Sequence, residues 1–312
     1  MKGKTIRYLD DGGLDVIEVE VPAPGHGEVQ VQGGVCGVCA WDLYTFHHGA
    51  KAPSAAPPGH EGMGTVVALG PDVRGLAVGD KVAGGGFATL RNLKAASVYR
   101  LPPCDLPDEQ WMVEPVSCVV TGVDHCDLKI GDRVAVVGCG FMGLLLLQCL
   151  VGSFAEQVIA IDVDAHRLEL ADAYGADEVL NPRDSHFAAR IAELRALGID
   201  TVVDASGTQA GLDTSFGLVR RGGRINLFGW IHGPATAPGS AWHGGGYTVV
   251  ASSPSAKLRD TFPVAIRLIE VGMVDLSELV THVVPLDEMA TLLRGATTGE
   301  VKDYVKGVIR LE

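Results

Sequence analysis

The chain has 312 residues, of which 47% are hydrophobic and 20% are charged, and its formal net charge is −13 at pH 7. A chain of this length can bury substantial cores and is expected to form two domains. The acidic balance, without a run of Lys or Arg, argues against nucleic acid and anionic membranes as partners. The longest apolar run, around Leu144–Val151, is too short to span a bilayer. The seven scattered cysteines do not resemble a disulfide framework, so we expect a reducing, cytoplasmic location.

The first part of the chain alternates apolar and polar side chains in short runs that end at Gly or Pro. This period of two is typical of half-exposed antiparallel strands. We expect such strands at Asp15–Val21, Glu28–Gln32, Gly64–Leu69 and Asp80–Ala83. The N-terminal part is therefore predicted to be an all-β module.

From about Asp132 onward, the pattern changes to strands that alternate with helices. We expect helices at residues 165–174, 185–197 and 208–220, and buried strands at residues 201–203, 225–228 and 247–250. This part is expected to contain six strands in all, enough for a complete doubly wound parallel sheet of the α/β class.

The tail of the chain has elements but no partners of its own. We expect a helix at Phe262–Val271, a strand at His282–Val284, a helix from Asp287 and a final strand near Val305–Leu311. These elements are predicted to return to the β module. The predicted domains are therefore residues 1–115 with 256–312, and residues 116–255.

The most informative stretch runs from Arg133 to Arg167. An apolar, β-branched strand at Val134–Val137 leads into a glycine turn, and a Leu-rich helix follows at Leu144–Leu150. A second apolar strand at Val158–Ile161 then ends on an acid, Asp162. This strand, turn, helix and strand, with an acid 19 residues after the third glycine, match the dinucleotide-binding pattern.

Each part of this pattern has a physical role in binding a dinucleotide. Gly138 allows the tight turn, Gly140 lets backbone N–H groups approach a pyrophosphate, and Gly143 lets the helix pack close to its strand. The N–H groups of the first helical turn, with Phe141 and Met142 between the glycines, offer partial positive charge to the phosphates. A glycine turn alone occurs in many α/β proteins, but the complete context favours dinucleotide binding.

The acid at the end of the second strand sets the expected choice of coenzyme. Asp162 would accept hydrogen bonds from both hydroxyls of the adenosine ribose and would repel a 2′-phosphate. The sequence therefore predicts NAD rather than NADP.

Three places in the β module carry candidate metal ligands: Cys36 and Cys39 with Asp42, then His60 and Glu61, then Glu114 before a proline. Thiolate, imidazole and carboxylate groups together suit a tetrahedral zinc site that keeps one position open for substrate. Each residue alone also fits a structural role, as a buried thiol, a turn histidine or a helix-start acid. Taken together, beside a dinucleotide pattern, they favour a catalytic metal.

These motifs, in this order, resemble those of the zinc-dependent medium-chain dehydrogenases, the group of alcohol, sorbitol and threonine dehydrogenases. The matching segments are Cys39-Ala-Trp-Asp42, Gly59-His60-Glu61-Gly-Met-Gly64, Val78-Gly-Asp-Lys-Val82, Glu114-Pro115, the glycine turn and Leu279–Leu286. The resemblance implies a GroES-like β domain that is interrupted by a Rossmann domain and resumes after it. It also implies a homo-oligomer that acts on a small alcohol or ketone.

The resemblance also implies roles for individual residues. Cys39, rather than Cys36, would hold one catalytic zinc together with His60 and either Glu61 or Glu114. Asp42 would orient His60 through its other ring nitrogen. Arg167 matches a basic position near the adenosine ribose.

The sequence departs from this family in two ways. Trp41 stands where the family usually has a Ser or Thr that starts the proton relay, and Tyr44 stands where histidine is frequent. Glu61, Tyr44, His47, His48 or a chain of waters remain alternatives for that relay. The four-cysteine lobe that holds a structural zinc in the family is missing, so we expect one zinc per chain.

The function expected from the sequence is reversible hydride transfer between NAD and a secondary alcohol such as a polyol, cyclitol or sugar alcohol. Two alternatives stay open at this point. One is a zinc-free reductase of the same fold that acts on enones or quinones. The other is a non-catalytic NAD-binding scaffold, with Trp41 as a sign of lost activity.

Overall fold

The computed structural model describes residues 1–50 and 58–311. The chain divides into two compact units, one formed by Met1–Pro115 with Ala265–Glu312 and the other by Val116–Val264. The second boundary was expected after residue 255, whereas the second unit ends at Val264, inside helix α8 (Phe262–Glu270). No helix among the described residues is long and apolar enough to cross a membrane.

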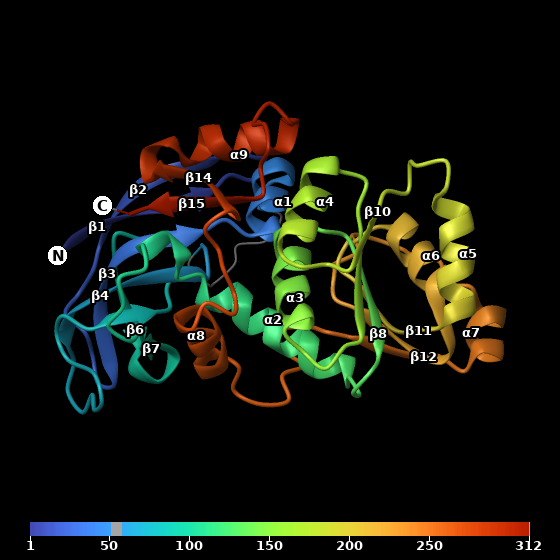
Figure 1. Ribbon diagram of the computed structural model, residues 1–312. Helices are drawn as coiled ribbons and strands as arrows, with labels where there is room; N and C mark the ends of the chain where they lie inside the picture. The colour runs from blue at the N-terminus through green and yellow to red at the C-terminus, as the bar shows by residue number, and fades with distance from the viewer. Residues whose placement is uncertain (51–57, 312) are drawn as a thin grey trace. The chain divides into compact units, whose positions relative to one another are not determined.

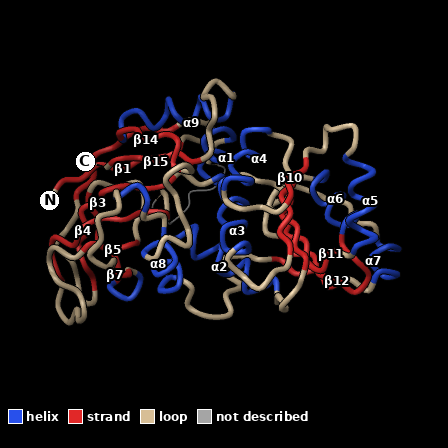
Figure 2. The backbone as a smooth tube through the Cα atoms, in the orientation of Figure 1, coloured by secondary structure: helices blue, strands red, loops and turns tan. Residues whose placement is uncertain are grey.

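The first unit is built on a seven-stranded sheet, in which β6 pairs with β3 beside the path β14-β15-β3-β4-β5-β7. Its strands are β3 (Glu28–Gly37), β4 (Glu61–Leu69), β5 (Lys81–Ala83), β6 (Leu90–Lys94), β7 (Tyr99–Arg100), β14 (Val280–Pro285) and β15 (Lys306–Arg310). A separate antiparallel pair is formed by β1 (Lys2–Tyr8) and β2 (Leu14–Glu20). Figure 2 shows this concentration of strands in the first unit.

The tail of the chain completes this sheet, because β15 pairs with β3 and β14 pairs with β15. The helix expected from Asp287 begins as a 3₁₀ turn at Leu286–Glu288 and continues as α9 (Met289–Thr298). The unit also contains α1 (Ala40–His48), which follows β3 directly. The sequence analysis did not place a helix there.

The strand expected at Glu28–Gln32 is present, and one of its polar residues departs from the half-exposed pattern. The strand β3 continues to Gly37 and lies in the middle of the sheet, with β15, β4 and β6 as partners. Gln32 is exposed and Glu28 is half-buried, but Gln30 between them is fully buried. Its amide donates to Pro22 O at 3.0 Å and to Asn92 Oδ1 at 3.1 Å, which offsets the cost of burying it.

The second unit is a doubly wound α/β fold with a six-stranded sheet in the order β10-β9-β8-β11-β12-β13. All neighbouring strands are parallel. The strands are β8 (Arg133–Val137), β9 (Gln157–Ile161), β10 (Glu178–Leu180), β11 (Ile199–Asp204), β12 (Val219–Leu227) and β13 (Thr248–Ala251). The order reverses between β8 and β11, and such a switch point is where open α/β sheets bind ligands.

Helices cover this sheet on both sides, with α3 and α4 on one side and α5 and α6 on the other (Figure 1). The helices of the unit are α2 (Val113–Cys126), which begins at the boundary, α3 (Phe141–Val151), α4 (Ala165–Ala173), α5 (Phe187–Leu197), α6 (Gln209–Leu218) and α7 (Gly239–Gly245). The helix expected at 208–220 ends earlier because Val219 already pairs with β11. The four leucines Leu144–Leu147 are fully buried, so α3 is apolar on all sides.

Candidate active site

Three candidate metal ligands lie together in the first unit, and sheet pairing explains why. The end of β3 lies beside the start of β4, with Gly37 opposite Glu61. Cys39 follows Gly37 by two residues and His60 precedes Glu61, so the pairing brings both to one place. One ligand atom each of Cys39, His60 and Glu61 lies within 4.8 Å of the other two.

The choice between the two glutamates, which the sequence left open, has a geometric basis. Glu61 is the first residue of β4 and is buried beside Cys39 and His60. Glu114 lies in the first turn of α2 and is not part of this group of candidate ligands in the described portion of the chain. The structure therefore brings Glu61, and not Glu114, to the thiol and the imidazole.

Glu61 has a buried cationic partner that the sequence analysis did not identify. Lys306, the first residue of β15, forms an ion pair with Glu61, and both side chains are less than 5% exposed. The Lys306 Nζ also donates to Val38 O at 2.8 Å. Burial lowers the pKa of Lys306, but the charge of Glu61, the nearby Cys39 and the hydrogen bond to Glu61 together outweigh burial and raise it. The lysine is therefore charged at neutral pH and compensates the buried carboxylate.

A glycine makes room for this pair. A Cβ at Gly37 would overlap Glu61 Oε2 and would lie 2.8 Å from the sulfur of Met112 and 3.0 Å from Cε of Lys306. The Glu61 carboxylate thus lies across the backbone of β3, where only glycine leaves space. Glycine is therefore needed at this strand end to make room for the Glu61 side chain, and not to allow an unusual backbone torsion angle.

Cys39 is positioned by the start of α1. It is the residue before the helix, and its backbone N–H donates to Asp42 Oδ2 at 2.8 Å. The other Asp42 oxygen accepts a hydrogen bond from Tyr8 Oη at 2.9 Å. Among the described residues, the expected hydrogen bond between Asp42 and His60 is not found. Asp42 therefore holds the backbone of Cys39.

The chemistry of this group fits a divalent metal ion. Burial, and next the nearby Glu61 carboxylate, raise the pKa of the Cys39 thiol to about 12. A cation in contact with the sulfur would offset both effects and stabilise the thiolate. Thiolate, imidazole and carboxylate are three ligands that zinc accepts, and three protein ligands leave a fourth position open.

Aromatic rings line the exposed side of α1 next to Cys39. Trp41 stacks with Tyr44 at 5.8 Å between ring centroids, and Tyr44 stacks with His48 at 4.1 Å. His47 meets His48 edge to face. The indole of Trp41 is 48% exposed, and it carries one N–H donor and no acceptor. It therefore offers a flat apolar surface on α1 but cannot accept a proton.

In the second unit, the glycine turn lies at the carboxyl end of β8, beside the switch point of the sheet. Gly138 has φ of 95°, and a Cβ at Gly143 would overlap Gly138 O. The first bond within α3 runs from Leu144 N to Gly140 O at 2.9 Å. The N–H groups in the first turn of a helix face its N-terminal end, where an anion can accept hydrogen bonds from them.

Asp162 and Arg167 lie at the same turn. Asp162 Oδ2 accepts the N–H of Cys139 at 2.6 Å, and its Oδ1 accepts the N–H of Asp164 at 2.9 Å. These bonds fix a buried carboxylate against the glycine turn, at the end of β9. Nη1 of Arg167 lies 3.9 Å from the position that a Cβ of Gly140 would take, so the guanidinium borders the turn.

Two residues of the first unit that carry this geometry were missed by the sequence analysis. Lys306 lies in a predicted strand that also contains Arg310, so its charge alone does not mark it as buried. Tyr8, which donates to Asp42, carries no signal either, because it lies in an ordinary amphipathic run.

Comparison with known proteins agrees with this fold. Residues 25–103 match the model of the alcohol dehydrogenase GroES-like domain, and residues 142–270 match that of the zinc-binding dehydrogenases. D-arabinitol dehydrogenase 1 of Uromyces fabae is 30% identical over 90% of each chain, and (R,R)-butanediol dehydrogenase of Bacillus subtilis is 25% identical over 98% of this chain and 99% of that protein. A solved oxidoreductase/dehydrogenase of unknown specificity from Escherichia coli superposes with a TM-score of 0.91 at 24% identity over 100% of both chains, which shows the same fold. The chain therefore belongs to the zinc-type medium-chain alcohol dehydrogenase family and is an oxidoreductase that acts on alcohols.

Proposed function

We propose that this enzyme is a zinc-dependent dehydrogenase that moves a hydride between a secondary alcohol of a polyol-type substrate and NAD. The observation that carries the proposal is the grouping of Cys39, His60 and Glu61, whose ligand atoms lie within 4.8 Å of one another. These three residues would hold one catalytic zinc. In this proposal the first unit is the catalytic domain, and the second is the dinucleotide-binding domain.

When bound, zinc supplies Lewis acidity that lowers the pKa of a coordinated hydroxyl group. The residues of this chain have supporting roles. Lys306 neutralises Glu61 and fixes the direction of its carboxylate, while Asp42 holds the backbone that presents Cys39. The hydroxyl proton leaves by a route that excludes residue 41, because an indole has no acceptor.

A polyhydroxylated substrate is supported by the surroundings of Cys39. The stacked Trp41 and Tyr44 rings present an apolar face to C–H groups, whereas His47 and His48, at the end of the same helix, offer donors and acceptors. The D-arabinitol dehydrogenase of Uromyces fabae and the sorbitol dehydrogenase of Gallus gallus, both similar to this chain, are named for polyols.

NAD rather than NADP is proposed because Asp162 places a negative charge at the ribose end of the glycine turn. A single zinc per chain is proposed because only six residues join β5 to β6, which leaves no room there for a four-cysteine lobe. In the ranges that the structure describes, Cys39, His60 and Glu61 form the sole group of three potential ligands.

We further propose that copies of the chain associate with one another. Light scattering would measure the mass of the assembly in solution.

The experiment that tests this function is a screen of NAD⁺ reduction over polyols, cyclitols and amino alcohols, using protein of measured zinc content. We expect about one zinc per chain and turnover of a polyol. Cys39→Ala should lose both the zinc and the activity. The matched control is Cys104→Ala, which removes an exposed thiol and should change neither.

The same screen separates the alternatives. Reduction of enones or quinones by metal-free wild-type protein would favour a zinc-free reductase. Binding of NADH without turnover of any substrate would favour a non-catalytic scaffold. Retained activity in Cys39→Ala would remove zinc from the mechanism.

A further inference from the structure

The second unit contains a cavity that the dehydrogenase reaction does not use. It has a volume of about 750 Å³, within the usual size range of ligand pockets, roughly 300 to 1,000 Å³. Its lining comes from the end of α5 with Gly198, the start of β12, and α7 with Tyr247 just before β13. The lining residues include Arg195, Leu197, Arg220, Arg221, Gly244 and Tyr247.

This cavity lies at the opposite end of the sheet from the glycine turn. Its lining residues flank the points where β11, β12 and β13 begin. The glycine turn follows the end of β8, which is parallel to β11. Since β11 spans six residues at about 3.3 Å each, the two places are separated by roughly 20 Å. The cavity is therefore distinct from the coenzyme site.

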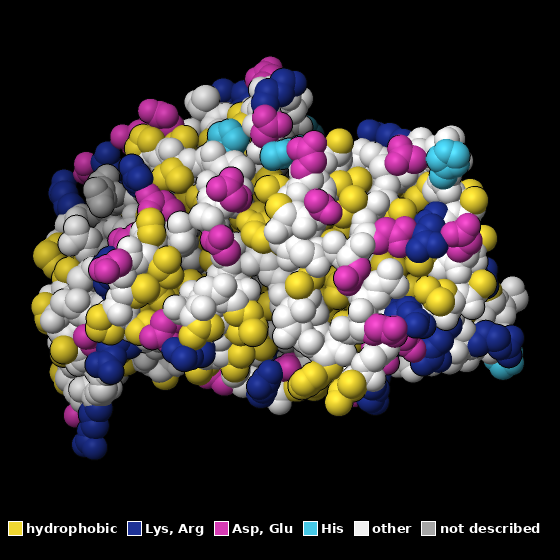
Figure 3. Space-filling view, viewed as in Figure 1, with side chains coloured by type: hydrophobic (Ala, Val, Ile, Leu, Met, Phe, Trp, Pro, Cys, Tyr) yellow, Lys and Arg dark blue, Asp and Glu magenta, His cyan; other side chains and the backbone are white. Residues whose placement is uncertain are grey.

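The charge of the cavity is unusual for this chain. Three arginines and no acidic residue line it, although the protein carries a net charge of −13. Figure 3 shows Lys and Arg side chains gathered over α7 and the neighbouring strand ends. An anion would meet attraction here, whereas the acidic surface elsewhere repels it.

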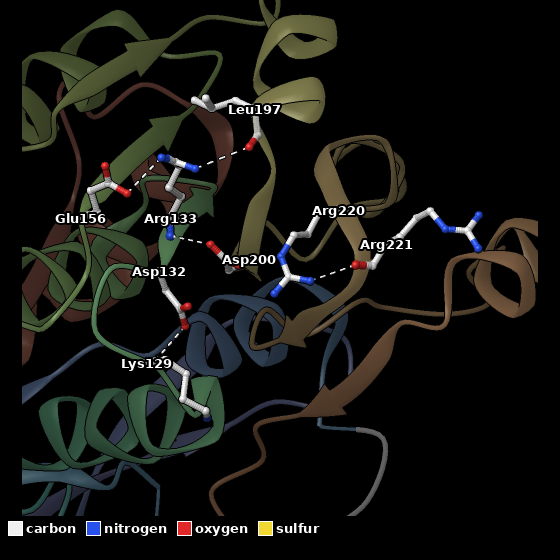
Figure 4. A network of polar contacts seen from close by, with 8 residues as sticks. All are labelled: Lys129, Asp132, Arg133, Glu156, Leu197, Asp200, Arg220 and Arg221. Carbon is white, nitrogen blue, oxygen red and sulfur yellow. Dashed lines mark hydrogen bonds and ion pairs between the residues drawn. The ribbon is translucent and has the colours of Figure 1, made fainter.

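Two of the three arginines keep their charge available. Arg220 Nε binds Asp200 Oδ1 at 2.6 Å, and Asp200 Oδ2 accepts the backbone N–H of Arg133 at 2.9 Å (Figure 4). Each carboxylate oxygen of Asp200 therefore already accepts a hydrogen bond. Arg195 and Arg221 form no ion pair with any carboxylate in the described parts of the chain. Figure 4 shows the Arg221 guanidinium pointing away from that of Arg220.

Apolar residues complete the lining between the arginines. Leu197, Val219 and the ring of Tyr247 contribute to it. A Cβ at Gly245 would overlap the Tyr247 ring, so the backbone of α7 lies against this aromatic wall. A Cβ at Gly244 would meet nothing within 4 Å, which leaves the space beside it open. The lining thus combines an aromatic wall with guanidinium groups.

We propose that this cavity binds a small organic phosphate, with the phosphate on Arg195 and Arg221 and an apolar or aromatic group against Tyr247. Guanidinium groups form charge-assisted hydrogen bonds with phosphate oxygens, which are among the strongest in proteins. A second anion site, separate from the coenzyme, follows from this arrangement.

The test is isothermal titration calorimetry with phenyl phosphate and with inorganic phosphate, at low ionic strength. Saturating NAD⁺ is present so that the coenzyme site is filled, and no alcohol is added. We expect one phenyl phosphate per chain, bound more tightly than inorganic phosphate, with an affinity that falls as salt is added. Absence of binding in the NAD⁺-saturated wild type would overturn the proposal.

Two pairs of variants locate the site. Arg195→Gln with Arg221→Gln should weaken binding at least about tenfold, since two charge-assisted bonds are lost. Arg74→Gln, which removes an exposed arginine of the first unit, should not. Gly244→Glu should also weaken binding, because it adds a negative charge at an open position, whereas Gly244→Gln of the same size should have little effect.

The variants decide the outcome in either direction. Binding that is unchanged by the arginine pair and by Gly244→Glu would place the anion elsewhere and overturn the proposal. Equal losses of binding affinity in Gly244→Glu and Gly244→Gln would also overturn it, because they would show that the added bulk and not the added charge weakens binding. Circular dichroism of each variant confirms folding, and zinc-dependent activity, expected to be unchanged, serves as a second check.

Discussion

Lys306 and Glu61 form a buried ion pair between the first residues of β15 and β4, although 245 positions separate them in the chain. The two strands are not neighbours in the sheet, because β3 lies between them. The pair therefore reaches across β3 at Gly37, the position where a side chain would block it. Glu61, a candidate metal ligand, is thus held by Lys306 of β15, the last strand in the sequence.

The first prediction concerns the stability of metal-free protein. Lys306→Met removes the partner of a buried carboxylate, and breaking such a pair typically costs about 3 to 5 kcal/mol. We expect a loss of this size in the free energy of unfolding, measured by urea denaturation in the presence of a chelator. The double variant Lys306→Met with Glu61→Gln should be less destabilised than the sum of the two single variants. Additive losses would mean that the two charges do not interact.

The second prediction concerns the space above Gly37. Gly37→Ala introduces a Cβ that overlaps the Glu61 carboxylate, so the carboxylate must move away from Cys39. We expect a destabilisation of about 1 to 3 kcal/mol, typical of overpacking, and weaker zinc binding in a competition assay with a chromophoric chelator. The control is Gly217→Ala in α6, where a Cβ meets nothing within 4 Å and alanine is the better helix former. Wild-type zinc affinity in Gly37→Ala would show that Glu61 is not a ligand.

Much of the second unit could be predicted from the sequence, because most of its elements have a recognisable pattern within a short, continuous stretch. The apolar runs of β8 and β9, the glycine turn between β8 and α3, and the acid after β9 are contiguous signals. The strand β10 was not placed, since it is only three residues long and half-buried. A strand this short leaves no periodicity to detect.

The first unit was harder, because its sheet joins segments that are far apart. Alternation predicted strands but not that β3 is central, so the burial of Gln30 was not expected. The ligand types were visible, yet the choice between Glu61 and Glu114 needed the pairing of Gly37 with Glu61. The role of Lys306 became evident only from its ion pair with Glu61 in the structure. Pair contacts between distant strands have no signature in a single sequence.

A third prediction uses the environments of the cysteines. Burial raises the pKa of Cys139 to about 12, with a further contribution from Asp162, and burial raises the pKa of Cys149 to about 12. A raised pKa means less thiolate, about one part in ten thousand at pH 8, so both thiols should resist iodoacetamide. Cys104 is exposed and should react first, as mass spectrometry of timed samples would show.

The control for this experiment is Cys104→Ala, which should remove the fast phase of labelling. Addition of denaturant should then expose the remaining thiols and equalise their rates. Labelling of Cys139 in native protein as fast as that of Cys104 would contradict the buried position of the glycine turn against β9.

The last prediction concerns the coenzyme. Asp162→Ser removes the negative charge at the ribose end of the turn and so the repulsion of a 2′-phosphate. We expect the ratio of kcat/KM for NAD⁺ over NADP⁺ to fall at least about tenfold, which corresponds to about 1.4 kcal/mol. The control is Asp172→Ser, which removes an exposed acid of α4 and should leave the ratio unchanged. Because Asp162 also accepts the N–H groups of Cys139 and Asp164, the variant should weaken NAD⁺ binding as well, and a titration of protein fluorescence with NADH would measure this. An unchanged ratio together with weaker binding would make Asp162 a support of the turn and not the residue that distinguishes the coenzymes.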